Sequence, residues 1–176
     1  HEAGAKVVAV SDVYGGLYNK DGLDIPALFD YARKNRSLKG ATGGDALKDD
    51  EIFGVDCDIM IPAALNGVIT VPVARMIKAK VVIEGANNPT HPEADALLHE
   101  RGITVLPDIL VNAGGVTASY FEWTQNLTQF YWEFDEVRSK LERIMDRAYH
   151  EVGDIAKEKK VEWRLAAFIL GVQRVY

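Results

Sequence analysis

The sequence has little of what secreted, membrane-spanning or nucleic-acid-binding proteins need. Cys57 is the single cysteine among 176 residues, so no disulfide can form within the chain, and we expect a reducing compartment such as the cytoplasm. Lys and Arg number 20 against 26 Asp and Glu, a net charge of −6, whereas nucleic acids and anionic membrane surfaces attract positive charge. No apolar run approaches the roughly 20 residues that cross a bilayer. We therefore expect neither a nucleic acid nor a membrane as partner.

Familiar catalytic and metal-binding motifs are also missing. The histidines show no metal-ligand spacing among themselves or with Cys57; they are His1, His91, His99 and His150. The sequence has no Gly-x-Ser-x-Gly element and no phosphate-binding P-loop. We expect no metal site, and an inert, buried thiol at Cys57.

What the sequence does contain is an alternation of strand and helix patterns. Strands are predicted from β-rich apolar runs, over residues 6–11, 58–62, 80–84 and 103–106. The first has the continuous pattern of a strand buried on both faces, and a polar, glycine-rich loop is predicted after it, from Asp12 to Gly22. Helices are predicted between them, over residues 25–35, 70–79 and 90–102, the last with a capping box from Thr90 to Glu93. This order predicts an α/β fold, a Rossmann-like, doubly wound and mostly parallel sheet with helices on both faces.

Beyond Asp108 the strand patterns stop and helices follow. They are predicted from Gly114 to about Gln129, from Asp135 to about Ile155, and from Arg164 to Tyr176. The middle helix has a stripe of apolar residues at steps of three and four: Val137, Leu141, Ile144, Met145, Ala148, Val152 and Ile155. We expect residues 1–112 to form a dinucleotide-binding core and residues 113–176 to complete the domain and pack toward a substrate domain outside this chain.

The residues that follow the predicted strands are acidic, small or amide-bearing, and ligands of doubly wound sheets bind beyond these strand ends. Asp12 could accept hydrogen bonds from the ribose of NAD, although an aspartate there is more often a turn residue. Ala63 and Ala64 would let a flat nucleotide approach, or would only pack a helix on the strand. The Asn87 amide supplies both a donor and an acceptor, and Asn112 could bind a carboxamide. Together the four strand ends favour a dinucleotide site over unrelated turns.

The Gly-x-Gly-x-x-Gly turn of dinucleotide-binding domains is absent from the sequence. That turn would precede the strand ending in Asp12 by about 20 residues. The chain opens at His1 and runs almost directly into this strand, so we expect the first strand and its glycine-rich turn to lie upstream. The cofactor stays open, since Asp12 favours NAD and the loop Tyr14-Gly15-Gly16 could still admit the phosphate of NADP.

At the strand ends the sequence resembles the glutamate dehydrogenase family, in order along essentially the whole chain. The matching segments are residues 9–12 (AVSD), 15–19 (GGLYN), 58–65 (DIMIPAAL), 84–90 (EGANNPT), 92–95 (PEAD), 107–123 (PDILVNAGGVTASYFEW) and 156–159 (AKEK). Leucine, valine and phenylalanine dehydrogenases resemble the chain at Asn112 to Val116 but do not usually continue as residues 119–126 do here. Glutamate is therefore favoured as the substrate.

The resemblance implies reversible oxidative deamination of L-glutamate to 2-oxoglutarate and ammonia with NAD or NADP. Asn87 and Asn112 match positions near the nicotinamide ribose and carboxamide, and Ala63 and Ala64 match positions that line the nucleotide. Two further residues match the substrate pocket, and these are Val116 and Ser119. The family's catalytic lysine and aspartate belong to an N-terminal domain and have no counterpart here, so we expect no catalytic residue in this chain. Family members are usually hexamers.

Alternatives and departures stay open. A leucine, valine or phenylalanine dehydrogenase is the nearer alternative, and a non-catalytic dinucleotide-binding module is the more distant one. Asn66 stands where an acidic residue is common in the family, and Asn88 and His91 replace residues that are often smaller or hydroxylic. These positions border the expected cofactor site and leave its preference open.

Overall fold

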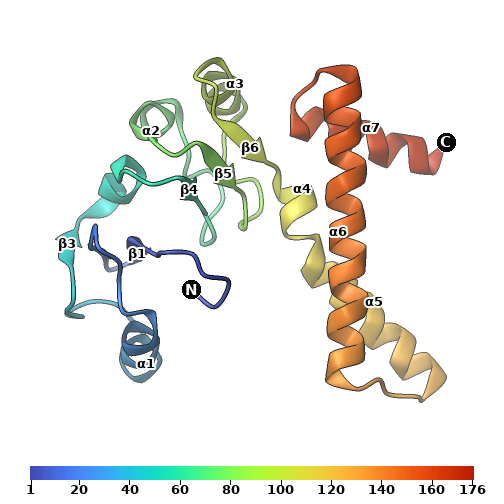
Figure 1. Cartoon of the computed structure of the whole chain (residues 1–176), viewed down its shortest axis with the longest axis horizontal. Coiled ribbons are helices and arrows are strands. Elements are labelled where there is room, and N and C mark those ends of the chain that lie inside the picture. Colours follow the sequence, from blue (N-terminus) through green and yellow to red (C-terminus); the bar gives the residue numbers. More distant parts are fainter.

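The strands form two separate sheets in the computed structural model, one antiparallel and one parallel (Figure 1). The structure describes the backbone of residues 1–176 and every side chain except that of Asp49. The antiparallel sheet has the order β1-β2-β3, with β1 at Ala9–Asp12, β2 at Gly15–Tyr18 and β3 at Asp45–Leu47. The parallel sheet has the order β4-β5-β6, with β4 at Ile59–Met60, β5 at Val81–Ile83 and β6 at Thr104–Leu106.

Helices occupy most of the remaining chain. The first group comprises α1 (Ile25–Asn35), the 3₁₀ helix η1 (Asp49–Gly54), α2 (Val71–Met76) and α3 (Pro92–Glu100). The second comprises α4 (Asp108–Val111), α5 (Ala113–Thr128), α6 (Phe134–Lys159) and α7 (Trp163–Val175). Parallel strands alternate with helices from β4 to β6, which confirms the predicted α/β fold. None of the helices, over the residues that the structure describes, is long and apolar enough to cross a membrane.

The first strand differs from its prediction. Residues 6–11 were expected in the parallel sheet, buried on both faces, with a loop following to Gly22. Instead β1 turns back at once, because Asp12 pairs with Gly15 in an antiparallel register. A Cβ at Gly16 would lie 2.8 Å from the carbonyl oxygen of Val10, so glycine is what lets β2 lie this close to β1. Gly15 and Gly16 suggested a loop, but the absence of a side chain at Gly16 is what allows β2 to pair with β1.

Local end signals explain where α1 begins and ends, and its predicted bounds are confirmed. The Asp24 carboxylate accepts a hydrogen bond from the Ala27 amide at 3.1 Å, and Pro26 lies in the first turn, where its missing N–H costs nothing. The helix ends at Arg36, whose φ of 56° is left-handed. Both signals lie within the helix's own sequence.

The predicted capping box of α3 is wrong. His91, not Thr90, is the N-cap residue, and no side-chain hydrogen bond caps this end. Thr90 forms a parallel β-bridge with Ile69, and the next amide, that of His91, donates to the Ile69 carbonyl at 3.0 Å. Pairing with this neighbouring segment buries Thr90 and removes its hydroxyl from the helix end. The helix still ends where predicted, just before Gly102.

The core of the parallel sheet lies under α2 and α3. Its side chains are aliphatic and buried, and among them are Ile69, Ile77, Val82 and Leu98, each with 0% exposure. Arg101 donates from its guanidinium to the carbonyls of Ala74 and Ile77. These hydrogen bonds provide partners for carbonyl groups at the C-terminal end of α2. The sheet is thus fixed from one face by two short helices.

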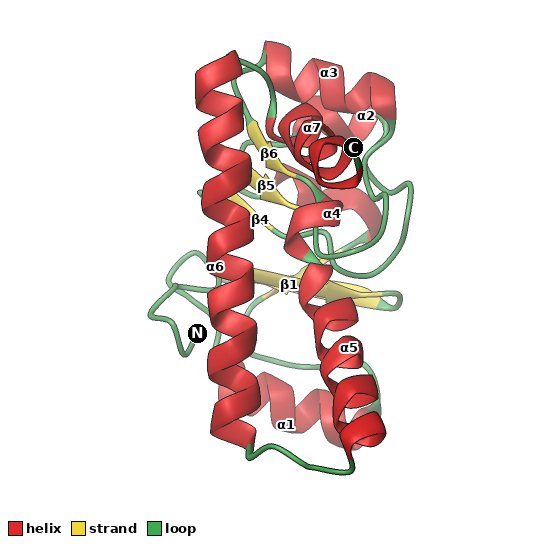
Figure 2. Cartoon of the chain, turned by 90° about the vertical axis from the view of Figure 1, so that its right-hand side faces the viewer, coloured by secondary structure: helices red, strands yellow, loops and turns green.

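The long helix α6 runs beside α5 along one part of its length and packs against α7 along another (Figure 2). Every residue of its predicted apolar stripe is buried or half-buried. On α7 the large apolar side chains of Leu165, Phe168 and Val172 are 50%, 54% and 58% exposed. The buried side carries Ala166 and Ala167 instead, and small side chains allow α7 to pack closely.

Candidate functional site

The loops that follow β4, β5 and β6 meet at the carboxyl edge of the parallel sheet. The Glu84 amide donates to the Leu106 carbonyl at 3.1 Å and the Ala86 amide to the Pro62 carbonyl at 2.9 Å, so pairing continues past the strand ends. A Cβ at Gly85 would lie 3.3 Å from the Cβ of Ala63. Small side chains therefore let two of these loops come together. The structure brings Ala63 beside the β5 loop, and Ala64 is exposed next to it.

Two of the predicted residues contact each other directly at this edge. The Asn112 Nδ2 group donates to the Asn87 Oδ1 atom at 2.7 Å. Asn112 lies at the junction of α4 and α5, where its φ of −92° and ψ of 4° turn the chain from one helix into the next. The pair leaves Asn87 Nδ2 as a donor and Asn112 Oδ1 as an acceptor without a protein partner among the described residues. A carboxamide needs this combination of a donor and an acceptor, so the donor set fits the nicotinamide end of a dinucleotide.

The backbone next to Asn87 is held in an uncommon conformation. Asn88 has a φ of 44°, a left-handed value that asparagine tolerates better than most residues. Its amide donates to the Asp108 carboxylate at 2.7 Å, and its carbonyl accepts from the Gly67 amide at 2.9 Å. The β5 loop is thereby tied to the start of α4 and to the β4 loop.

One guanidinium lies among three carboxylates behind this edge. Arg164 of α7 contacts Glu84 at 2.8 Å, Asp95 at 2.7 Å and Asp108 at 3.4 Å. The Glu84 side chain has 0% exposure and that of Arg164 23%. Burial alone would lower the pKa of Arg164, but its hydrogen bonds to Glu84 and Asp95 raise that pKa above its ordinary value. The arginine therefore stays charged and compensates a fully buried carboxylate.

The prediction missed Arg164. The one local hint is its position as a single charge in the apolar run of residues 163–170 (WRLAAFIL). Its partners lie 56 to 80 residues earlier in the chain.

Asp12 lies on the other sheet. Its carboxylate accepts hydrogen bonds from the Leu38 amide at 2.6 Å and the Tyr14 amide at 2.8 Å. Burial would raise the pKa of Asp12, yet these backbone donors hold it below its ordinary value. An open hollow of about 340 Å³ adjoins the carboxylate and is lined by residues 12–15 with Leu47 and Lys48. Asp12 is thus an ionised group beside a polar hollow.

The predicted substrate residues lie on the first turns of α5. The Val116 side chain is 71% exposed, and the Ser119 hydroxyl donates to the Gly115 carbonyl at 3.2 Å. Exposed aromatic side chains continue the same helix, namely Tyr120 and Trp123. Both predicted residues are therefore open to a ligand or to another protein segment.

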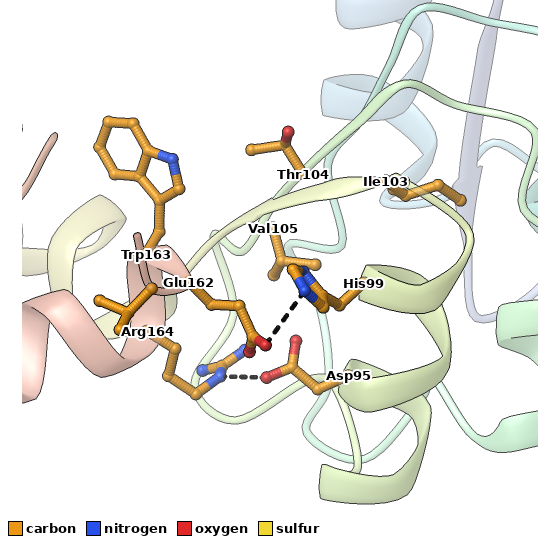
Figure 3. A pocket seen from close by; sticks show the side chains of 10 residues that line it. Asp95, His99, Ile103, Thr104, Val105, Glu162, Trp163 and Arg164 are labelled. Carbon is orange, nitrogen blue, oxygen red and sulfur yellow. Dashed lines mark hydrogen bonds and ion pairs between the residues drawn. The ribbon is translucent and has the colours of Figure 1, made fainter. Parts of the chain in front are cut away.

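A second hollow, of about 260 Å³, lies between the end of α3, β6 and the start of α7 (Figure 3). Arg164 forms an ion pair with Asp95 in its lining, and His99 Nε2 lies 3.5 Å from a carboxylate oxygen of Glu162. Neither Asn87 nor Asn112 lines it. The hollow is therefore separate from the amide pair.

The single thiol also fits its expected inertness. Cys57 is half-buried, and burial raises the pKa of its thiol, with Asp56 and Asp58 raising it further. A thiol with a raised pKa is a poor nucleophile at neutral pH.

Comparisons with known proteins show the family of the chain. The family model described as glutamate/leucine/phenylalanine/valine dehydrogenase matches residues 1–176. A glutamate dehydrogenase of Thermotoga maritima is 48% identical over 174 residues, which cover 99% of this chain and 42% of the relative. The chain thus spans well under half the length of this relative.

Solved structures show the same fold. The hetero-hexameric glutamate dehydrogenase from Thermus thermophilus in its Leu-bound form superposes with a TM-score of 0.91 at 35% identity, covering 98% of this chain and 41% of that one. The L-tryptophan dehydrogenase from Nostoc punctiforme gives a TM-score of 0.63 at 27% identity, covering 84% of this chain and 40% of that one. The chain belongs to the glutamate/leucine/phenylalanine/valine dehydrogenase family.

Proposed function

We propose that this chain is the dinucleotide-binding part of an enzyme that oxidatively deaminates L-glutamate to 2-oxoglutarate and ammonia, reversibly, with NAD or NADP. Residues 1–112 would form the nucleotide-binding core, and residues 113–176 would complete the domain and face a substrate domain outside this chain. The observation that carries the proposal is the Asn87–Asn112 pair at 2.7 Å, placed at the edge where doubly wound sheets bind ligands.

The residues at this edge would bind and orient the cofactor. Asn87 Nδ2 and Asn112 Oδ1 would hold the carboxamide, and Ala63 and Ala64 would leave room for the nucleotide. When bound, the cofactor supplies hydride transfer, and the protein supplies position and the exclusion of water. Asp12, kept ionised by its two backbone donors, would accept the ribose hydroxyls of NAD. This favours NAD without excluding NADP.

Glutamate is proposed over other amino acids because the 48% identical relative is a glutamate dehydrogenase. Val116 and Ser119 would line the substrate pocket, with the Ser119 hydroxyl donating to the distal carboxylate of glutamate. Proton transfers would rest on a lysine and an aspartate outside this chain. We also infer a homo-oligomer, a hexamer by resemblance to the family, in the cytoplasm; light scattering of the full-length protein tests the assembly.

The test is steady-state turnover by the full-length protein that contains this chain. Glutamate, leucine, valine and phenylalanine are compared, each with NAD and with NADP. A kcat/KM for glutamate at least a hundredfold above the others is expected. A preference for leucine, valine or phenylalanine would replace glutamate within the same family, and no turnover with any dinucleotide would overturn the proposal.

A matched pair of variants on α5 tests the substrate pocket. Ser119 is exposed and Thr124 half-buried, and each hydroxyl donates to the carbonyl four residues earlier. Ser119→Ala should raise the KM for glutamate about tenfold, because a hydrogen bond to a charged group is lost. Thr124→Ala should leave it unchanged. Equal KM values for the two variants would remove Ser119 from the pocket.

A further inference from the structure

The ionic cluster around Arg164 connects α7 to the residues that would bind the cofactor. Its three carboxylates come from the end of β5, from α3 and from the start of α4, and they are Glu84, Asp95 and Asp108. The first is fully buried, and the other two have 17% and 21% exposure. A single positive charge thus faces three negative charges. One arginine is enough to compensate the buried Glu84 carboxylate, so the two further carboxylates are not needed for that purpose.

Asp108 connects this cluster to the β5 loop. Its amide donates to the Glu84 carboxylate at 2.9 Å, and one of its own carboxylate oxygens accepts from Arg164. The other oxygen, Oδ2, accepts the Asn88 amide at 2.7 Å. Asp108 therefore faces the arginine on one side and the β5 loop on the other.

The amide that Asp108 accepts is the one that fixes the loop next to Asn87. Asn88 holds a left-handed φ of 44°, a conformation that costs free energy unless its surroundings determine it. The hydrogen bond to Asp108 is one of two that do so, the other running from Gly67 to the Asn88 carbonyl. The direction of the Asn87 side chain, and so its pairing with Asn112, depends on this backbone.

We propose that Arg164 is a positioning residue for the cofactor site: through Asp108 and the Asn88 amide it holds the Asn87–Asn112 pair in the arrangement that receives the carboxamide. This inference rests on the proposed function. The arginine itself does not touch the amide pair. Its three nitrogens Nε, Nη1 and Nη2 each face a different carboxylate, an arrangement that a planar fork can make and a lysine ammonium cannot.

Asp95 provides a matched control within the cluster. Both Asp95 and Asp108 pair with Arg164 and are similarly buried, but Asp95 makes the shorter contact, 2.7 Å against 3.4 Å (Figure 3 shows the Asp95 pair). Only Asp108 is also bonded to the β5 loop. If the cluster served stability alone, Asp95→Asn would be at least as harmful as Asp108→Asn in every measurement.

The experiment compares Asp108→Asn and Asp95→Asn in the full-length protein. The readouts are the dissociation constant of the dinucleotide, its KM, kcat at saturating dinucleotide, and the thermal midpoint. Asp108→Asn should raise the dissociation constant and the KM at least fivefold with kcat within a factor of two of wild type. Asp95→Asn should change the dissociation constant less than twofold while lowering the thermal midpoint at least as much.

Arg164→Lys supplies a second, independent readout. The lysine keeps a positive charge beside Glu84 but lacks the planar guanidinium that contacts three carboxylates at once. Dinucleotide affinity should therefore fall at least threefold in a protein that still folds. Equal effects of Asp108→Asn and Asp95→Asn on affinity, with wild-type binding intact, would overturn this inference alone. If the wild-type protein binds neither NAD nor NADP, the proposed function fails and takes this inference with it.

Discussion

Both sheets of this protein end a strand in a buried or half-buried carboxylate, yet the two are held in different ways. In the antiparallel sheet, Asp12 at the end of β1 is bonded to backbone amides of Tyr14 and Leu38. In the parallel sheet, Glu84 after β5 is paired with the side chain of Arg164, 80 residues further along the chain. One carboxylate is held by two backbone amides, 2 and 26 residues away, and the other depends on the side chain of a distant helix.

The difference has consequences for both stability and function. Backbone amides keep Asp12 ionised without a counter-ion, so removing another side chain does not leave this charge unpaired. At Glu84 the compensation is a single guanidinium, and removing it leaves a carboxylate with 0% exposure. The parallel sheet should therefore be the more sensitive of the two to a single substitution.

The largest effect is expected for Arg164→Ala. Breaking a buried pair by removing one partner typically costs about 3–5 kcal/mol of unfolding free energy. Denaturant unfolding of the variant measures this loss. Arg138→Ala is the control, because Arg138 pairs with Glu142 on the surface of α6 with 67% exposure and its loss should change the unfolding free energy far less. Similar losses of unfolding free energy for the two variants would contradict a larger contribution to stability from the buried Arg164 pairs than from an exposed pair.

The apolar cores of the two sheets give the next comparison. Leu98 of α3 is fully buried and Leu17 of β2 is 4% exposed. Leu98→Ala should cost about 4 kcal/mol, near the upper part of the range for buried leucines. Leu17→Ala should cost about 2 kcal/mol, since the small cluster around it can collapse more easily. The same unfolding measurement decides, and a larger loss at Leu17 would reverse the ranking of the two sheets.

A smaller effect, with a defined pH dependence, is expected for Asp12→Ala, about 1 kcal/mol. The folded-state pKa of Asp12 is depressed, so its contribution is fully present above the unfolded-state pKa of about 3.9. It is lost as the pH falls through the folded-state pKa. Wild type and variant should therefore differ in unfolding free energy at pH 7 and converge well below pH 4. A difference that stays constant with pH would point to lost packing instead.

The smallest effect is expected for Lys80→Ala. Lys80 pairs with Asp58 at 2.7 Å, but both side chains have 79% exposure. Exposed pairs contribute little and are screened by salt. The thermal midpoint should stay within about 1–2 °C of wild type, and a large drop would mean that this pair supports β4 and β5 in a way that its exposure does not indicate.

The sequence predicted features that depend on neighbouring residues, and it did not predict those that depend on contacts between distant elements. The bounds of α1 were predicted correctly from its apolar spacing, and the residues that fix its start, Asp24 and Pro26, are local as well. The apolar stripe of α6 was correct because one face of a helix is a short-range pattern. Four strand ends were predicted at one edge, and the three that follow β4, β5 and β6 do lie there, because parallel strands bring their carboxyl ends together. The placement of Asp12 with them was wrong, because β1 pairs antiparallel with β2 in a separate sheet.

The errors arose where tertiary neighbours decide. Thr90 was expected to cap α3, but a bridge to Ile69 holds it in the core. Which face of α7 is buried is also decided by its neighbours, since Ala166 and Ala167 are buried while the larger Leu165 and Phe168 are exposed. Arg164 was not predicted at all, since its three partners lie in three other elements.

The strand-end site is tested most directly by the dissociation constant of NADH or NADPH for the full-length protein. Asn112→Ala is compared with Asn35→Ala, an exposed asparagine on α1 whose amide bonds only to its own helix at Tyr31. We predict at least tenfold weaker binding for Asn112→Ala, equivalent to about 1.4 kcal/mol, and unchanged binding for Asn35→Ala. Equal constants for wild type and both variants would contradict a cofactor site at the carboxyl edge of the parallel sheet.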